Sequence, residues 1–167
     1  MVAPGVEEGR YTGALPTMHD AIILGSDHAG LDLKEKVKKA LDRLHVPCED
    51  IGTQSAESVD YPDYAHRVAE AVETGRFPRG IVVCGTGLGV SMAANRHPGV
   101  RAAVAYDEET ARLSREHNDS NVLALGSRSL DHALAERILE VWLNTPFAGE
   151  RHARRVLKIE LPKTEPR

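Results

Sequence analysis

The sequence predicts an α/β fold: a single doubly wound, Rossmann-like domain with a five-stranded parallel sheet and helices on both faces. Short apolar runs alternate along the chain with segments of helical hydrophobic spacing, and this alternation is typical of βαβ units. The expected strands are continuously apolar, as strands buried on both faces should be. A complete (β/α)8 barrel needs about 250 residues, so a chain of 167 residues is too short for one.

The first half of the chain supplies three expected strands and two helices. Residues 22–24 form an apolar strand, and the helix that begins near Gly30 has one apolar face and one face of lysine and glutamate. The strand 46–51 contains proline and acidic residues, which suit a sheet edge because proline cannot donate to the ladder. A second helix follows Pro62, and residues 81–83 form the third strand.

The second half continues the same alternation. The remaining strands are expected at 100–105 and 122–125, and helices are expected at about 88–95, after Asp107 as N-cap, after Ser129, and near 151–158. An edge position for the second strand favours the strand order 2-1-3-4-5. That order leaves the very apolar strand 122–125 at the other edge, where the C-terminal segment or a second subunit must cover it.

Composition and charge exclude several classes of protein. A hydrophobic share of 41% and a charged share of 28% indicate an ordered globular domain, assigned to 19–160. The net charge of −4 gives no basic excess for nucleic acid, and no apolar run reaches the roughly 18–20 residues that span a membrane. Residues 1–18 are expected to be a flexible leader without a signal peptide, and 161–167 a tail. The two cysteines then indicate free thiols in the cytoplasm.

The predicted order reverses between the first and third strands, and ligands of such sheets bind there, beyond the carboxyl ends of the strands. Asp27 and His28 follow the first strand, and Cys84 ends the third. Cys84 precedes a glycine-rich turn and a helix N-terminus, which favours a thiolate. Cys48 has no such surroundings and is interpreted as inert. A carboxylate, an imidazole and a thiol should therefore converge on one crevice.

Other candidates allow two interpretations each. The turn 85–89 can present backbone donors to an oxyanion or phosphate, but Val90 breaks the dinucleotide fingerprint, so NAD binding is the weaker alternative. His117, followed by Asn118, is either a helix cap or an acid–base group. Arg151 and Arg155 lie four residues apart and either grip a phosphate or form a solvated face. The histidines and cysteines lack metal-ligand spacing, so no metal is expected.

Five segments together resemble one enzyme family. They are GSDHAG (25–30), DYPDYA (60–65), CGTGLGVSMAAN (84–95), REHNDSNVLALGSR (115–128) and RHARR (151–155). The chain closely resembles the type B ribose-5-phosphate isomerases over roughly residues 20–160. The wider family includes isomerases of galactose 6-phosphate and allose 6-phosphate.

The resemblance implies a role for each matching residue. It implies that Cys84 is the base that moves a proton between C1 and C2, and that His117 opens the furanose ring, assisted by Asp27. Thr86 and the backbone around it would hold the enediolate. The implied substrate contacts are Asp27, His28, Tyr61, Gly85, Thr86, Gly87, Leu88, Gly89, Asn118, Arg128, Arg151 and Arg155, of which His28, Arg151 and Arg155 would hold the phosphate.

The resemblance also implies an activity and an assembly. The implied reaction is the interconversion of ribose 5-phosphate and ribulose 5-phosphate in the pentose phosphate pathway, with no cofactor and no metal. A homodimer or a dimer of dimers would share its active sites between subunits. Two alternatives stay open: a hexose-6-phosphate isomerase that acts on allose or galactose phosphate, and a non-catalytic nucleotide- or phosphosugar-binding module with a structural Cys84.

Overall fold

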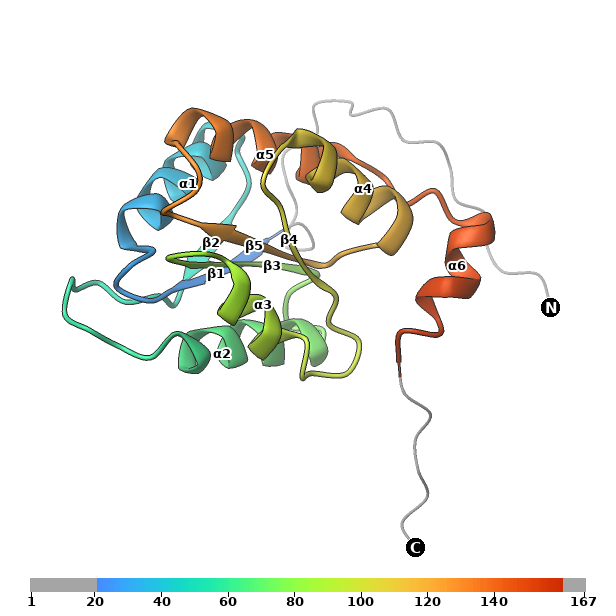
Figure 1. Cartoon of the computed structure of the whole chain (residues 1–167), viewed down its shortest axis with the longest axis horizontal. Helices are drawn as coiled ribbons and strands as arrows, with labels where there is room; N and C mark the ends of the chain where they lie inside the picture. The colour runs from blue at the N-terminus through green and yellow to red at the C-terminus, as the bar shows by residue number, and fades with distance from the viewer. Residues whose placement is uncertain (1–20, 161–167) are drawn as a thin grey trace, which may run out of the picture.

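A computed structural model describes residues 21–160, and within them one parallel sheet has the strand order β2-β1-β3-β5-β4 (Figure 1). The strands are β1 (Ile22–Ser26), β2 (Cys48–Asp50), β3 (Arg79–Cys84), β4 (Ala102–Val104) and β5 (Val122–Gly126). The helices are α1 (Leu31–Arg43), α2 (Tyr61–Glu73), α3 (Leu88–Ala94), α4 (Glu108–Asn118), α5 (His132–Asn144) and α6 (Glu150–Val156). The expected leader and tail lie outside the described residues.

Helices cover both faces of the sheet, which confirms the predicted α/β class. Figure 1 shows α1, α4 and α5 on one side of the sheet and α2 with α3 on the other. Each side has its own apolar core. The first core joins α1 and α5 to the sheet and includes the fully buried Trp142, while the second joins α2 and α3 to the opposite face. The alternating sequence pattern therefore builds one sheet between two helical layers.

The predicted strand order is wrong at one edge, because β5 and β4 exchange places. All five residues of β5 are buried, and the strand pairs with β3 on one side and β4 on the other. β4 has only three residues, each half-buried, and forms the edge. A continuously apolar strand is more stable between two neighbours, and the short strand tolerates the edge. The expectation that strand 122–125 needs an external cover is therefore also wrong.

The side chain of Asn95 occupies backbone groups on the outer side of β4, whereas Asn121 bonds to the chain just before β4 on the side that faces β5. The amide group of Asn95 donates to the carbonyl of Ala102 at 2.9 Å and accepts from the N–H of the same residue at 2.8 Å. Just before the strand, the Oδ1 atom of Asn121 accepts from the Arg101 N–H at 2.8 Å. Side-chain amides can imitate a neighbouring strand in this way, so they satisfy backbone groups that an edge would otherwise expose.

A buried lysine anchors the loop that follows β2. The Nζ atom of Lys34, whose side chain is fully buried, lies 2.7 Å from the carbonyl oxygen of Thr53 and 2.9 Å from the carboxylate of Asp50. Burial alone would raise the pKa of Asp50, but hydrogen bonds from Lys38 and Lys34 outweigh burial and leave that pKa below its usual value. This anchor holds residues 50–53 beside the end of β1, where Thr53 donates to the Ser26 carbonyl at 3.0 Å.

Candidate active site

A hollow of about 240 Å³ opens beyond the carboxyl ends of β1 and β3. The loops that follow β1, β3 and β5 contribute to it, together with the first residue of α2. Its lining residues are Asp27, His28, Ala29, Tyr61, Cys84, Gly85, Thr86, Gly89 and Arg128. The sequence predicted this convergence from the reversal of strand order between β1 and β3. The error at the β4 edge leaves that reversal unchanged.

Cys84 lines the hollow at the end of β3, just before the turn that leads to α3. The residue is 5% exposed, and its Sγ atom accepts the backbone N–H of Gly87 at 3.1 Å. Gly87 has a φ of +78°, in the left-handed region that glycine adopts without steric cost, and this turn aims its N–H at the sulfur. The Gly87 N–H at the start of α3 is therefore positioned to donate to this sulfur.

Cys48, by contrast, has surroundings that oppose ionisation. Burial, followed by the nearby negative charge of Asp50, raises the pKa of the Cys48 thiol to about 11. Neither cysteine is in a disulfide. The chemically inert interpretation of Cys48 agrees with these surroundings.

Asp27 and His28 are oriented by backbone groups. The Oδ1 atom of Asp27, which is 6% exposed, accepts the N–H of Gly30 at 2.9 Å. The Nδ1 atom of His28 accepts the N–H of Val59 at 3.1 Å. With Nδ1 acting as acceptor, the proton of this imidazole lies on Nε2, which is then available to donate to a ligand.

Tyr61 and Arg128 pack against glycines of the 85–89 turn. A Cβ atom on Gly89 would lie 2.6 Å from the Tyr61 ring, and one on Gly85 would lie 3.0 Å from the guanidinium carbon of Arg128. The Arg128 backbone N–H also donates to the Gly85 carbonyl at 2.9 Å. Glycine at these two positions therefore lets an aromatic ring and a cation lie directly over the backbone of the turn.

The other predicted members of the turn have local roles. Gly87 and Leu88 do not line the hollow. The Leu88 N–H donates to the hydroxyl oxygen of Thr86 at 3.3 Å, and Leu88 is 45% exposed at the surface of the molecule. Within one chain, the residues of the turn that line the hollow are therefore Gly85, Thr86 and Gly89 rather than the whole turn.

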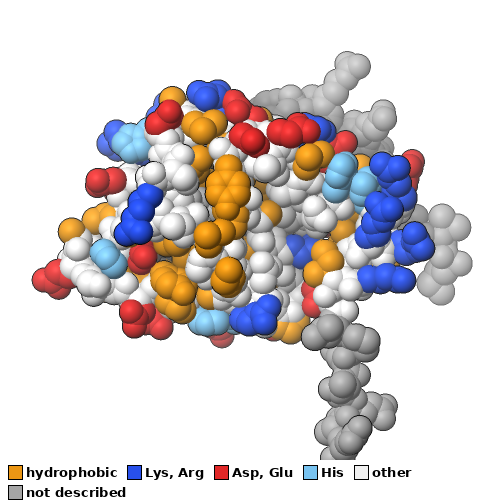
Figure 2. Space-filling view, in the orientation of Figure 1, with side chains coloured by type: hydrophobic (Ala, Val, Ile, Leu, Met, Phe, Trp, Pro, Cys, Tyr) orange, Lys and Arg blue, Asp and Glu red, His pale blue; other side chains and the backbone are white. Residues whose placement is uncertain are grey.

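Four predicted residues lie away from the hollow: His117, Asn118, Arg151 and Arg155. The first two end α4, and the two arginines are exposed on α6. Figure 2 shows Lys and Arg side chains gathered at the side of the molecule where Figure 1 places α6. The left-handed C-cap of α4 is Asp119, with a φ of 47°, so His117 and Asn118 do not form the cap that was their alternative interpretation.

His152 is a residue of this region that the sequence analysis missed. It is 8% exposed, and its ring stacks on that of His117, with the ring centroids 4.2 Å apart and the planes 6° from parallel. The available signal was its place in the RHARR segment between two implied phosphate contacts. A histidine beside arginines gave no sign that its ring would turn toward α4.

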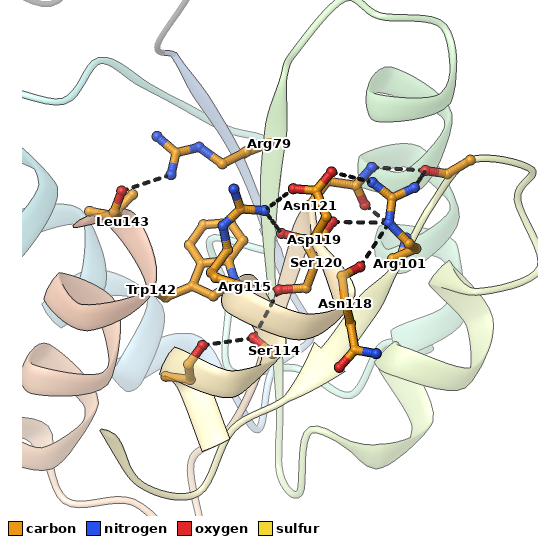
Figure 3. A network of polar contacts seen from close by, with 12 residues as sticks. Arg79, Arg101, Ser114, Arg115, Asn118, Asp119, Ser120, Asn121, Trp142 and Leu143 are labelled. Carbon is orange, nitrogen blue, oxygen red and sulfur yellow. Dashed lines mark hydrogen bonds and ion pairs between the residues drawn. The ribbon is translucent and has the colours of Figure 1, made fainter. Parts of the chain in front are cut away.

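A larger cavity, of about 460 Å³, lies between the α3–β4 loop and the end of α4, but most of its polar groups are already paired. Arg101 there donates to the carbonyls of Asn118 and Asp119 at 3.1 and 3.0 Å. Figure 3 shows this network, in which Ser120 also accepts the indole N–H of Trp142. We therefore assign the chemistry to the smaller hollow, where a thiol and a carboxylate meet.

Two further searches of residues 21–160 concern other classes of site. No group of three or more histidine, cysteine, aspartate or glutamate side chains in this range could hold a metal ion. None of the helices in the same range has the length and apolar character needed to cross a membrane.

Comparison with known proteins gives a consistent result. The Ribose/Galactose Isomerase family matches residues 22–159. Ribose-5-phosphate isomerase B of Escherichia coli is 47% identical over 135 residues, which cover 81% of this chain and 91% of that protein.

Solved structures match as well. Ribose-5-phosphate isomerase B of Clostridium thermocellum is 52% identical with a TM-score of 0.82, covering 83% of this chain and 94% of that one. The enzyme of Mycoplasma genitalium, solved with bound ribulose-5-phosphate, is 40% identical with a TM-score of 0.80, covering 83% and 93%.

Proposed function

Because the chain belongs to the ribose/galactose isomerase family, we propose that it interconverts D-ribose 5-phosphate and D-ribulose 5-phosphate, as in the pentose phosphate pathway. The observation that carries the proposal is the Sγ atom of Cys84, which accepts a backbone N–H at 3.1 Å in a hollow that also holds Asp27. Both groups have the chemistry that moves protons on a sugar. We infer that the enzyme acts in the cytoplasm, where the free thiols of Cys48 and Cys84 would stay reduced.

The first step is the opening of the furanose ring. His117 donates a proton to the ring oxygen while the bond between that oxygen and C1 breaks. Asp27 takes the proton of the C1 hydroxyl, which leaves an aldehyde at C1 and a hydroxyl at C4. Histidine suits this step because its pKa is ordinarily near neutrality.

The second step is proton transfer at carbon. The Cys84 thiolate takes the proton from C2, and the electron pair forms the C1–C2 double bond of an enediolate with its negative charge on O1. Gly85 and Thr86 line the hollow, and their backbone N–H groups would stabilise that oxygen, a contribution typically worth about 3 kcal/mol per donor. The thiol then returns the proton to C1, and the O2 hydroxyl proton moves to O1, which gives the ketose.

The phosphate needs cationic and N–H donors at the far end of the substrate. His28 lines the hollow, and with its Nδ1 atom accepting from Val59 its Nε2–H would serve as one such donor. Arg151 and Arg155 lie elsewhere on the same chain, so we propose that they reach the hollow of a partner subunit, together with His117. Such a homodimer would have two sites, each built from both chains.

Exposed hydrophobic side chains support this assembly. Leu88 is 45% exposed, Met92 66% and Tyr106 47%. Figure 2 shows hydrophobic side chains gathered over the region of α3, close to the hollow. Apolar surface of this kind on a globular protein marks an interaction site, and a second copy would cover it while delivering His117.

The test of the activity is turnover of purified protein with a panel of sugar phosphates. We expect kcat/KM for ribose 5-phosphate to exceed the values for allose 6-phosphate and galactose 6-phosphate. Preference for a hexose phosphate would replace the pentose assignment. A protein that binds nucleotide or phosphosugar and isomerises none of the panel would overturn the proposed activity.

The test of the shared site is complementation between two inactive variants. Chains carrying Cys84→Ala and chains carrying His117→Ala are unfolded together, refolded as a mixture, and assayed. A hybrid dimer regains one intact site, so an equal mixture should recover roughly a quarter of wild-type activity. No recovery, in a mixture that mass spectrometry shows to contain hybrids, would place His117 and Cys84 in the same chain's site.

A further inference from the structure

Two imidazole rings stack at the contact between α4 and α6. The ring centroids of His117 and His152 are 4.2 Å apart, and the ring planes are 6° from parallel. His117 is half-buried in the last turn of α4, and His152 is buried. A flat partner at this distance restricts rotation of the His117 ring about its χ2 angle, so the direction of the His117 nitrogen atoms depends on His152.

His152 is held in place by both side-chain and backbone contacts. The Nε atom of Arg151 donates to Nε2 of His152 at 3.4 Å, and the His152 backbone N–H donates to the Gly149 carbonyl at 2.9 Å. The loop before α6 is tied to α4, because the Ala148 N–H donates to the Glu116 carbonyl at 3.0 Å. Because Nε2 acts as an acceptor, the His152 ring is neutral with its proton on Nδ1.

Burial and the charges around the pair both act on the pKa of His152, which lies below the ordinary histidine value. Burial is the largest cause that lowers the pKa of His152, followed by positive charge on His117, Arg151 and Arg155; the carboxylate of Glu116 acts in the opposite direction. On α4, Glu109 also interacts with His117, and Arg112 forms ion pairs with both Glu109 and Glu116. As the pH falls, positive charge on His117 therefore opposes a second charge on His152.

We propose that His152 is a positioning residue for His117, a neutral ring whose stacking holds the His117 imidazole in the orientation that delivers a proton to the ring oxygen of the sugar. This inference rests on the proposed function, since the role of His117 belongs to that proposal. His152 itself touches no reacting atom. Its effect should therefore be confined to ring opening and should spare proton transfer at carbon.

The substrate pair allows these two steps to be measured separately. Ribose 5-phosphate cyclises through O4 and must be opened. Ribulose 5-phosphate has no furanose form, because its O5 carries the phosphate. In deuterium oxide, uptake of deuterium at C1 of ribulose 5-phosphate reports enediolate formation by Cys84 without ring opening, and both rates can be followed by NMR on the full-length protein.

Three variants are compared: His152→Ala removes the stack, His152→Phe keeps a flat neutral ring, and His132→Ala is a matched control at an exposed histidine of α5. We expect His152→Ala to lower kcat for ribose 5-phosphate by about 10- to 100-fold, as a displaced catalytic group does, and to leave deuterium exchange close to wild type. His152→Phe should restore most of the turnover, and His132→Ala should change neither rate.

NMR also tests the stack without reference to activity. The ring protons of His117 should resonate upfield in the wild type and in His152→Phe, and should lose this ring-current shift in His152→Ala. Equal loss of turnover and exchange in His152→Ala, unchanged turnover in that variant, or failure of His152→Phe to restore activity would overturn the positioning role. A wild-type protein that neither isomerises nor exchanges would instead overturn the proposed function, while the NMR result would still stand.

Discussion

The hollow around Cys84 and the α4–α6 contact differ in how their functional groups are held. In the hollow, backbone N–H groups bond to the side chains of Cys84, Asp27 and His28. These donors lie at or just before the starts of α3, α1 and α2. At the α4–α6 contact, one ring stack and one hydrogen bond of 3.4 Å orient His152, and the arginines of α6 are exposed. The sheet thus fixes one set of groups, whereas the second set depends on helix packing.

This difference indicates which groups of the proposed reaction are positioned within one chain and which depend on a partner chain. The proposed base Cys84 and the backbone donor that contacts it belong to one chain, so the fold of that chain sets their geometry. In the proposed reaction, His117 for ring opening ends α4, Arg151 and Arg155 for phosphate binding lie on the short helix α6, and a partner chain would have to present all three. Variants of the two regions should therefore fail in different ways, and the predictions below go from the largest expected effect to the smallest.

Replacing Cys84 with alanine should have the largest effect. Turnover of ribose 5-phosphate is expected to fall by about 10³-fold, the range associated with loss of a general base. Binding of the substrate, measured by calorimetry, should stay close to wild type because the phosphate contacts remain. Cys48→Ala is the matched control and should keep its activity. Wild-type kcat in Cys84→Ala would contradict the catalytic assignment.

Replacing Arg155 with glutamine should weaken substrate binding more than it slows chemistry. Loss of one charge-assisted hydrogen bond to phosphate is expected to lower kcat/KM by about 10- to 100-fold, mainly through KM. Steady-state kinetics separate the two parameters. Arg154→Gln removes a neighbouring exposed charge of α6 and should have little effect. Similar losses in both variants would show that general positive charge, rather than a specific contact, is responsible.

Replacing Gly126 with alanine should displace the backbone of Thr86, which lines the hollow. A Cβ atom there would lie 2.5 Å from the carbonyl carbon and oxygen of Thr86, which are backbone atoms that cannot move aside easily. We expect a loss of about 2 kcal/mol in the free energy of unfolding by urea, together with reduced kcat. Gly75→Ala is the control, because a Cβ atom there meets open space while the φ of +73° is unfavourable for alanine. It should lower the free energy of unfolding by about 1 kcal/mol and leave kcat unchanged.

Acidification should loosen the α4–α6 contact, and this is the smallest expected effect. Burial and the charge on His117 lower the pKa of His152 in the folded state, so the unfolded chain binds the proton more readily. The contribution of His152 to the free energy of unfolding is therefore complete above the ordinary histidine pKa of about 6.5. It is lost as the pH falls from there toward the lower pKa of the folded state. We expect the melting temperature to fall between pH 8 and pH 5, and to fall less steeply with pH in His152→Phe than in the wild type. An identical slope in both proteins would contradict it.

The sequence predicted the sheet and the hollow because both depend on short-range patterns. Continuous apolar runs located the strands, and the reversal of order between β1 and β3 brought Asp27 to Cys84. The exchange of β4 and β5 was missed because it depends on which strand the packed helices leave at the edge. Complete burial of β5, with Val122 paired to both Gly80 and Ala102, is a tertiary outcome that local composition does not determine.

The α4–α6 contact could not be derived from local patterns. His117 and Arg155 were assigned roles only through the family resemblance, since a histidine at a helix end and spaced arginines fit several functions equally well. The stack of His117 on His152 depends on the angle at which α6 meets α4. That angle is set by the loop 145–149, including the Ala148 N–H bonded to the Glu116 carbonyl, and no periodic signal encodes it.

The asparagines beside β4 have a consequence for how copies of this chain can associate. Asn95 already occupies both the N–H and the carbonyl of Ala102. A strand from another molecule therefore finds these two groups already bonded, which disfavours edge-to-edge extension of the sheet at this residue of β4. The proposed homodimer needs no strand at this edge, because it would form through side-chain surfaces.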